Sequence, residues 1–172
     1  MKQNFILFGI LVLCLSCTEK ENTAQLGPLL SEQLKFSHTD ENWFVPTQVA
    51  VNGLTSEQAN WKDSTDNHSI AELISHLAFW NEIQLRAFKG EDFSDFKIDN
   101  DTTFVTYTQE GWNNIVLKLD SIQMELKQLT ENANEEQLSE WASNMSAIAS
   151  HNAYHAGQVV YIRKRNGWWN RK

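Results

Sequence analysis

Two histidines lie one helical turn apart near the end of the chain, at His151 and His155. Residues four apart share one face of a helix, and Ile148, Val159 and Ile162 follow the same stripe, so both imidazoles are expected to point inward. A polar group buried without a partner costs about 1–3 kcal/mol. A single metal ion would satisfy both rings, since neutral imidazole binds zinc, nickel, copper and iron.

A third ligand is suggested by His76, which lies between Leu73 and Trp80 on another apolar helical stripe. Three histidines would leave coordination positions open for water or substrate, as in catalytic zinc sites. Spacing alone does not place His76 beside the other two, and a pair of partly exposed or hydrogen-bonded histidines is the alternative interpretation. His38 and His68 fall in polar segments and are predicted to lie at the surface.

The first 16 residues have the pattern of a bacterial lipoprotein signal. Their apolar run is too short to span a bilayer and ends in Leu13-Cys14-Leu15-Ser16-Cys17, which resembles a lipobox with Cys14 where Leu is usual. We expect cleavage before Cys17, lipidation of that residue and a tether over residues 17–27. The protein would then be anchored in the cell envelope outside the cytoplasm. Exposure of the domain at the cell surface is one arrangement that this anchor allows. An ordinary signal peptide, which would release a soluble secreted protein, is the alternative.

Cysteine count and charge exclude several kinds of chemistry. Cys14 would leave with the signal and Cys17 would carry lipid, so the mature domain would have no disulfide, cysteine nucleophile or thiolate ligand. Loss of Lys2 with residues 1–16, which hold no Asp or Glu, changes the net charge from −8 to −9. An acidic chain repels phosphate backbones, so no nucleic-acid partner is expected. The basic run Arg163-Lys164-Arg165 suits a helix C-terminus.

Apolar residues at spacings of three and four predict one all-α domain over residues 28–172, with no strand pattern. The first predicted helical region covers residues 28–53, with a break near Pro46 and a new cap at Thr39 or Asp40. The next long helices are predicted over residues 70–90, capped by Ser69, and over residues 108–132. A last helix is predicted from Ser143 or Asn144 to Gly167. Thr55 and Gln58 predict a short capped turn. Residues 135–141 are expected to form a connection, and residues 91–101 a loop over one end that could cover a site.

Three stretches together resemble the DinB/YfiT-like superfamily of metalloenzymes. They are Asn52-Gly53-Leu54-Thr55-Ser56-Glu57-Gln58, His68-Ser69-Ile70-Ala71-Glu72-Leu73-Ile74-Ser75-His76-Leu77, and His151-Asn152-Ala153-Tyr154-His155-Ala156-Gly157-Gln158 followed by Ile162-Arg163-Lys164. The resemblance extends from about Leu29 to Trp169. It implies an up-down-down-up four-helix bundle and a divalent metal, zinc or nickel, held at one end of the bundle by His76, His151 and His155.

The resemblance does not fix the reaction, because relatives include thiol-dependent transferases, a mycothiol-dependent maleylpyruvate isomerase and metal-dependent hydrolases. Low-molecular-weight thiols are chiefly cytoplasmic, so a hydrolase acting on an unidentified small molecule is expected first for an exported protein. A thiol-dependent S-transferase and a non-enzymatic metal- or ligand-binding lipoprotein are the alternatives. The lipid anchor is the only membrane contact that we expect. For the assembly state, a homodimer is considered beside a monomer.

No catalytic residue is assigned from the sequence. The chain has neither an H-E-x-x-H nor a G-x-S-x-G motif, and no residue beside the histidines is an evident general base. Asn152 is interpreted as stabilising a nearby turn and Tyr154 as packing on the opposite face. Gly157 and Gln158 are interpreted as allowing close helix packing.

Overall fold

The computed structural model describes residues 26–169, and every regular element in that range is helical. The elements are α1 (Leu26–His38), α2 (Thr47–Val51), α3 (Ser56–Asn60), α4 (Ile70–Phe88), the 3-10 turn η2 (Asn100–Thr103), α5 (Gln109–Asn132) and α6 (Glu135–Arg165). The all-α prediction is therefore confirmed for these residues. The predicted signal peptide and the predicted lipidation site Cys17 lie outside them.

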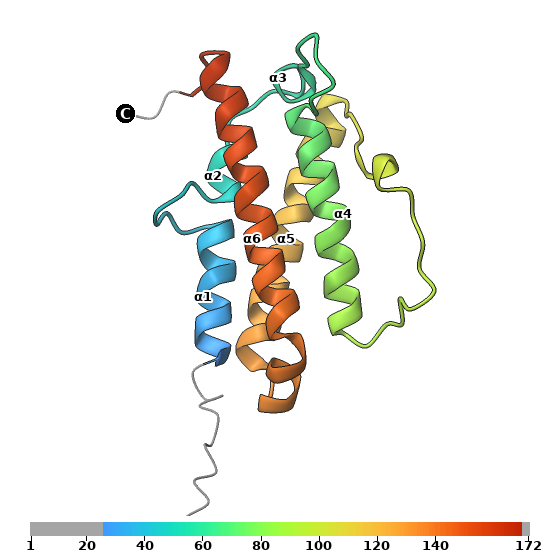
Figure 1. The fold of residues 1–172 in the computed structure, drawn as a ribbon. Coiled ribbons are helices and arrows are strands. Elements are labelled where there is room, and N and C mark those ends of the chain that lie inside the picture. The colour runs from blue at the N-terminus through green and yellow to red at the C-terminus, as the bar shows by residue number, and fades with distance from the viewer. Residues whose placement is uncertain (1–25, 170–172) are drawn as a thin grey trace, which may run out of the picture.

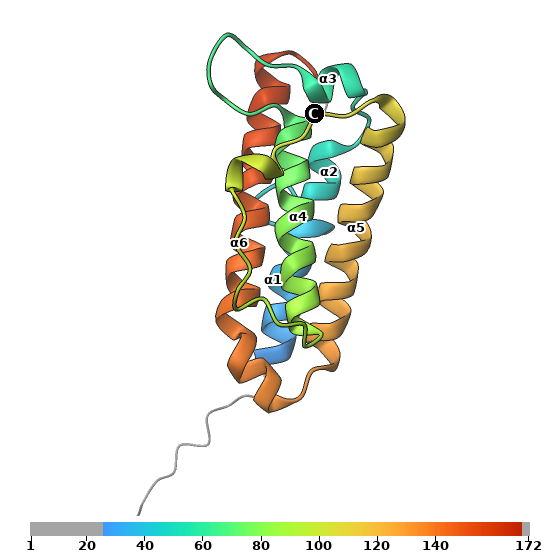
Figure 2. The same cartoon turned by 90° about the vertical axis from the view of Figure 1, so that its right-hand side faces the viewer.

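The four long helices α1, α4, α5 and α6 lie side by side, with α1 and α6 running in one direction and α4 and α5 in the other (Figure 1). Because α4 and α5 point the same way, the chain must return along the full length of α4 before α5 begins. Residues 89–108 make that return, and Figure 2 shows them passing along the outside of α4. The predicted loop over one end is thus a strap along the side of the molecule.

Side chains cap the starts of α3 and α4 as the sequence predicts, and a further helix start also has a side-chain cap. Ser69 accepts a hydrogen bond from the Glu72 backbone N–H, and the Glu72 carboxylate accepts one from the Ser69 N–H, which completes a capping box for α4. Thr55 and Gln58 form the same arrangement at α3, and Thr108 caps α5. These local bonds fix where α4 begins, and so place His76 about two turns along it.

Two helix boundaries differ from the prediction. The last helix begins at Glu135, because Asn134 and Gln137 form a capping box and no Pro or Gly interrupts the residues that follow. The predicted connection over residues 135–141 and the predicted cap at Ser143 or Asn144 are wrong. In the first region, α1 ends at His38 and Pro46 stands directly before α2, so neither Thr39 nor Asp40 caps a helix.

The core consists of two apolar clusters stacked along the helices. One includes Ile70, Leu77 and Trp112, and the other includes Leu30 and Leu126. The chain leaves the last helix through a left-handed turn at Gly167, which has a φ of 71°. Within residues 26–169, none of the helices combines the length and the apolar character needed to span a membrane.

Candidate metal centre

Three histidine side chains converge between α4 and α6. The Nε2 atom of His151 lies 3.2 Å from that of His76 and 2.9 Å from that of His155. One ring nitrogen from each residue can be chosen so that all three lie within 4.8 Å of one another. His76 and His155 are buried and His151 is half-buried. The structure therefore brings together the three residues that the sequence singled out as candidate ligands.

The strap between α4 and α5 fixes the protonation of His76. The Thr103 hydroxyl donates its only proton to the Asn100 carbonyl oxygen over 2.7 Å. The same hydroxyl oxygen lies 2.8 Å from His76 Nδ1, so the ring nitrogen must be the donor in that contact. A neutral His76 carrying its proton on Nδ1 presents a lone pair at Nε2, the nitrogen that faces the other two histidines.

Gln158 does the same for His155 from within α6. Its Oε1 atom lies 2.6 Å from His155 Nδ1, and its Nε2 atom donates to the Tyr154 hydroxyl over 3.4 Å. A carbonyl oxygen can only accept, so His155 Nδ1 carries the proton and its Nε2 has a lone pair. Gln158 is therefore a partner of a candidate ligand, contrary to the packing role predicted for it.

The environment keeps these rings neutral. Burial, reinforced by the charge of neighbouring histidines, lowers the pKa of His76 and of His151 from 6.5 to about 4. Burial also lowers the pKa of His155, with Gln158 acting in the opposite direction. Neutral imidazole is the form that binds metals.

The donor set fits a cation better than it fits the three rings alone. With lone pairs fixed at Nε2 of His76 and His155, a proton on His151 Nε2 can be donated to only one of them. The Nε2 lone pair of the other histidine then has no hydrogen-bond donor within the cluster. A divalent cation would accept all three lone pairs, and three nitrogen ligands match the protein contribution to an open zinc site.

A cleft of about 560 Å³ reaches the cluster at His76 and His151. Its remaining walls carry an indole ring, small apolar side chains and uncharged polar groups, namely Trp80, Asn81, Gln84, Asn100, Ser143, Asn144, Ala147 and Ile148. The Trp80 indole N–H donates to the Asn100 side-chain oxygen over 3.1 Å, which ties the strap to α4 beside the cleft. A small molecule can therefore reach two of the three candidate ligands.

Two buried asparagines join α4 to α6 beneath the histidines. Asn81 and Asn152 exchange hydrogen bonds of 2.9 and 3.1 Å through their side-chain amides, and both are about 1% exposed. Asn81 also donates to the Leu77 carbonyl oxygen. Asn152 thus has a cross-helix partner, where the sequence interpretation gave it a local turn.

A fourth histidine lies close behind the cluster. The Phe104 ring stacks on His76 with centroids 4.5 Å apart and on His68 with centroids 3.6 Å apart, nearly parallel to both. One face of a phenyl ring holds a single ring at such distances, so the two histidines cover opposite faces. His68 is exposed, as predicted. The aromatic stack gives it a fixed place that its loop position does not suggest.

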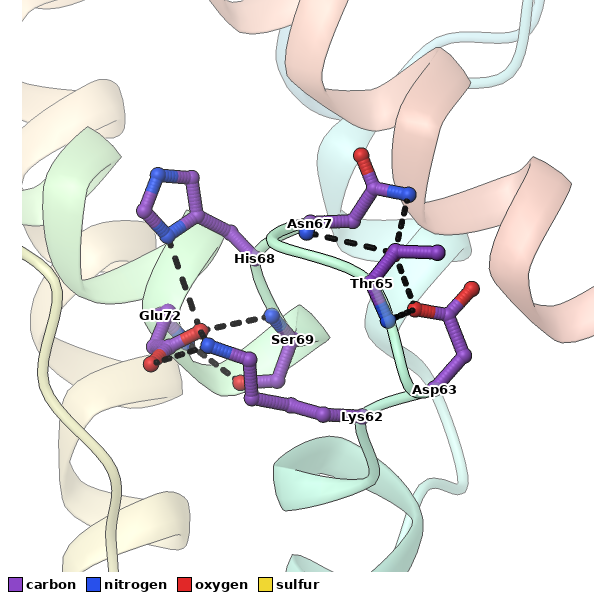
Figure 3. A network of polar contacts seen from close by, with 7 residues as sticks. All are labelled: Lys62, Asp63, Thr65, Asn67, His68, Ser69 and Glu72. Carbon is purple, nitrogen blue, oxygen red and sulfur yellow. Dashed lines mark hydrogen bonds and ion pairs between the residues drawn. The ribbon is translucent and has the colours of Figure 1, made fainter.

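The loop that carries His68 is anchored to the start of α4. Figure 3 shows Lys62 and His68 directed at the Glu72 carboxylate, which also accepts the Ser69 N–H over 2.7 Å. Lys62 Nζ lies 3.2 Å from this carboxylate and His68 Nδ1 lies 3.6 Å from it. The carboxylate that caps α4 therefore also holds the fourth histidine in position.

Other residues differ from their predicted roles. His38 is 3% exposed and hydrogen bonded to Asp120, so its predicted surface position is wrong. Gly157 is exposed, and a Cβ placed on it would meet nothing within 4 Å, so it does not permit a close helix contact. Tyr154 is exposed. Thr103 was not singled out at all, because a threonine 27 residues from its histidine carries no local signal.

One of three comparisons with known proteins gives a match. Neither the curated proteins nor the solved structures include a match to the chain. The sequence profile of the DinB superfamily matches residues 45–159, more than half of the 172 residues, and this span contains all three clustered histidines. The chain belongs to the DinB superfamily.

Proposed function

We propose that His76, His151 and His155 bind one divalent cation, zinc or nickel, and that the protein is a metal-dependent hydrolase of an uncharged polar small molecule. The observation that carries the metal site is the convergence of three Nε2 atoms. In His76 and His155 the ring proton is held on Nδ1, which leaves a lone pair on Nε2. A bound divalent cation supplies Lewis acidity, which polarises a substrate and acidifies water.

The chain's own residues have separable roles in this proposal. Thr103 and Gln158 orient the ligand rings through their Nδ1 protons. Phe104 covers one face of His76 and keeps water from that side. The open side is the cleft, where the Trp80 ring and the amides of Asn100 and Asn144 offer a flat apolar surface beside hydrogen-bonding groups. These are contacts for a neutral, polar molecule.

The makeup of the cleft bears on the alternatives. Among the described residues that line it there is no Lys or Arg to pair with the carboxylates common in low-molecular-weight thiols, which favours a hydrolase over a thiol-dependent S-transferase. The same residues include no Asp or Glu to act as a general base. This second feature favours a non-enzymatic metal- or ligand-binding protein as the other candidate.

Elemental analysis and activity assays of the purified protein test the proposal. About one divalent ion per chain is expected, with most of it lost in His155→Ala. The metal-loaded protein should hydrolyse neutral nitrophenyl esters or amides faster than the His151→Ala variant. Thiol conjugation without hydrolysis would support the S-transferase, and bound metal with neither activity would support the binding protein. Unchanged metal content in His155→Ala would refute the site.

We further propose that the four long helices form the up-down-down-up four-helix bundle implied by the resemblance, and that the chain is an exported lipoprotein anchored through Cys17. The support for export is the apolar run and lipobox-like stretch in residues 1–17. Cys17→Ser should release the protein from membranes in cell fractionation. Membrane association that persists in this variant would contradict lipidation at that residue.

A further inference from the structure

A second cavity, of about 760 Å³, lies away from the three histidines. It opens between α2 and α5 and also reaches His38 at the end of α1. None of the three candidate metal ligands lines it. The metal centre and the hydrolase proposal therefore assign it no role.

The walls of this cavity are largely apolar. Val51, Leu54, Ile74, Trp112 and Leu119 line it, and each is less than a tenth exposed. Trp112 donates its indole N–H to the Leu54 carbonyl oxygen over 3.0 Å, so one wall is also held by a hydrogen bond. A cavity of this size with apolar walls can take the apolar body of a small molecule.

A buried amide without a hydrogen-bond partner belongs to Gln123, which lines the same cavity. Gln123 is 3% exposed, and neither its side-chain nitrogen nor its side-chain oxygen has a hydrogen-bond partner. Burying both atoms unpaired costs the desolvation free energy of a donor and of an acceptor. Such a group is unusual in a folded protein and calls for a partner that the chain does not supply.

The charge near Gln123 limits what that partner can be. Asp120 lies one turn earlier on α5 and accepts hydrogen bonds from His38 over 2.7 Å and from Gln48 over 3.0 Å. Asp120, His38 and Gln48 all line the cavity, which contains no Lys or Arg among its described lining residues. An anionic head group would meet a carboxylate with no cation to offset it. An ammonium group can only donate, and so would leave the Gln123 nitrogen without an acceptor, which favours an uncharged head group that both donates and accepts.

The chain itself shows how a buried amide is satisfied. Asn81 and Asn152 pair through two reciprocal hydrogen bonds, each amide acting as donor and acceptor. The protein covers the Gln123 nitrogen and oxygen, so a ligand amide pairs with them in the same way once the Gln123 side chain turns toward the cavity. We propose that this cavity binds an uncharged small molecule that has an apolar body and a carboxamide head group, with the head group paired to the Gln123 amide.

Octanamide and octanoate make a matched pair of probes, because they share an apolar chain and differ in the charge of the head group. Binding to the purified protein is followed by the NMR signal of the Trp112 indole N–H, which lies at the cavity wall. Octanamide is expected to shift this signal saturably, and octanoate at neutral pH to bind about tenfold more weakly or worse.

Variants on α5 separate recognition of the amide from general apolar binding. Gln123→Met keeps the side-chain length without the amide and should weaken octanamide binding by about tenfold. Gln128→Met is the control, because Gln128 is exposed on the same helix and outside the cavity. Val116→Phe narrows the cavity while retaining the amide, and should also reduce binding. This second variant keeps the test valid if Gln123→Met does not fold.

His155→Ala distinguishes this proposal from the metal proposal, since octanamide should bind that variant as it binds the wild type. The cavity proposal is overturned if octanamide gives no saturable shift up to its solubility limit. It is also overturned if Gln123→Met or Val116→Phe folds and binds octanamide as tightly as the wild type does. Loss of octanamide binding in His155→Ala would likewise overturn it by placing the probe at the histidines.

Discussion

The Thr103 hydroxyl accepts a hydrogen bond from His76 Nδ1 over 2.8 Å and thereby directs the His76 lone pair at the other two histidines. Thr103 lies on the strap between α4 and α5, so this connection also sets the chemistry of a residue on α4. The same threonine donates to the Asn100 carbonyl oxygen, which leaves it no freedom to reverse the bond. The candidate metal site thus depends on a segment outside the helices that carry its ligands.

Removing this hydroxyl should weaken metal binding without removing a ligand. Thr103→Val keeps the side-chain shape and leaves His76 Nδ1 without its acceptor, and loss of such a partner typically costs about 10- to 100-fold in metal affinity. Competition with a chelator measures the affinity. Thr103→Ser, which retains the hydroxyl, is the matched control and should bind metal nearly as the wild type does. Equal affinity in Thr103→Val would show that the hydroxyl does not orient the ring.

The amide pair between α4 and α6 should contribute to stability as a unit. Asn152→Leu leaves buried Asn81 without its cross-helix partner and is expected to lower the free energy of unfolding by about 1–3 kcal/mol. The double variant with Asn81→Leu should lose less than the sum of the single losses, because no amide then remains unpaired. Urea denaturation measures each value. Asn114→Leu, at an exposed position on α5, should change stability by less than about 0.5 kcal/mol. Additive losses would show that the two amides act independently.

The unpaired amide of Gln123 should be a cost to the fold. Replacing it with Met removes a buried donor and a buried acceptor while filling a similar volume. We expect Gln123→Met to raise the free energy of unfolding by about 1–3 kcal/mol in the absence of ligand. Urea denaturation beside Gln128→Met, the exposed control, checks this. A decrease in stability would mean that the amide makes a favourable interaction in the folded protein.

Acid should destabilise the metal-free protein through its buried histidines. The pKa values of His76 and His151 are lowered from 6.5 to about 4, chiefly because burial disfavours the charged rings. Between pH 4 and pH 6.5, the unfolded chain binds more protons than the folded chain. The free energy of unfolding therefore falls as the pH drops from about 6.5 toward 4. Burial lowers the pKa of His155 and of His38 as well, which adds to the effect.

Thermal unfolding across this pH range measures the dependence. A His76→Gln, His151→Gln double variant should show a shallower fall, because two of the shifted groups are gone. Gln128→Met is the control, since Gln128 is exposed on α5 and does not titrate. An identical pH profile in the double variant would show that the two rings titrate alike in the folded and unfolded chains.

The sequence by itself determined the helical architecture and the candidate ligands. Helix starts depend on bonds between residues three apart, so Ser69 with Glu72 and Thr55 with Gln58 could be recognised locally. Helical periodicity placed His151 and His155 on one face without any knowledge of the partner helix. The start of α6 was missed because its first turns are mostly exposed and polar, although Asn134 and Gln137 carried a local capping signal.

Only the tertiary structure decided how His76 is oriented and which other polar groups are buried. His76 meets Thr103 across 27 residues, Asn81 meets Asn152 across 71, and His38 meets Asp120 across 82. Such contacts form because distant segments pack against one another, and no repeat or spacing within either segment predicts them. The sequence therefore supplied three histidines on inward faces, whereas packing fixed the lone pair of His76, buried His38 and left Gln123 without a partner.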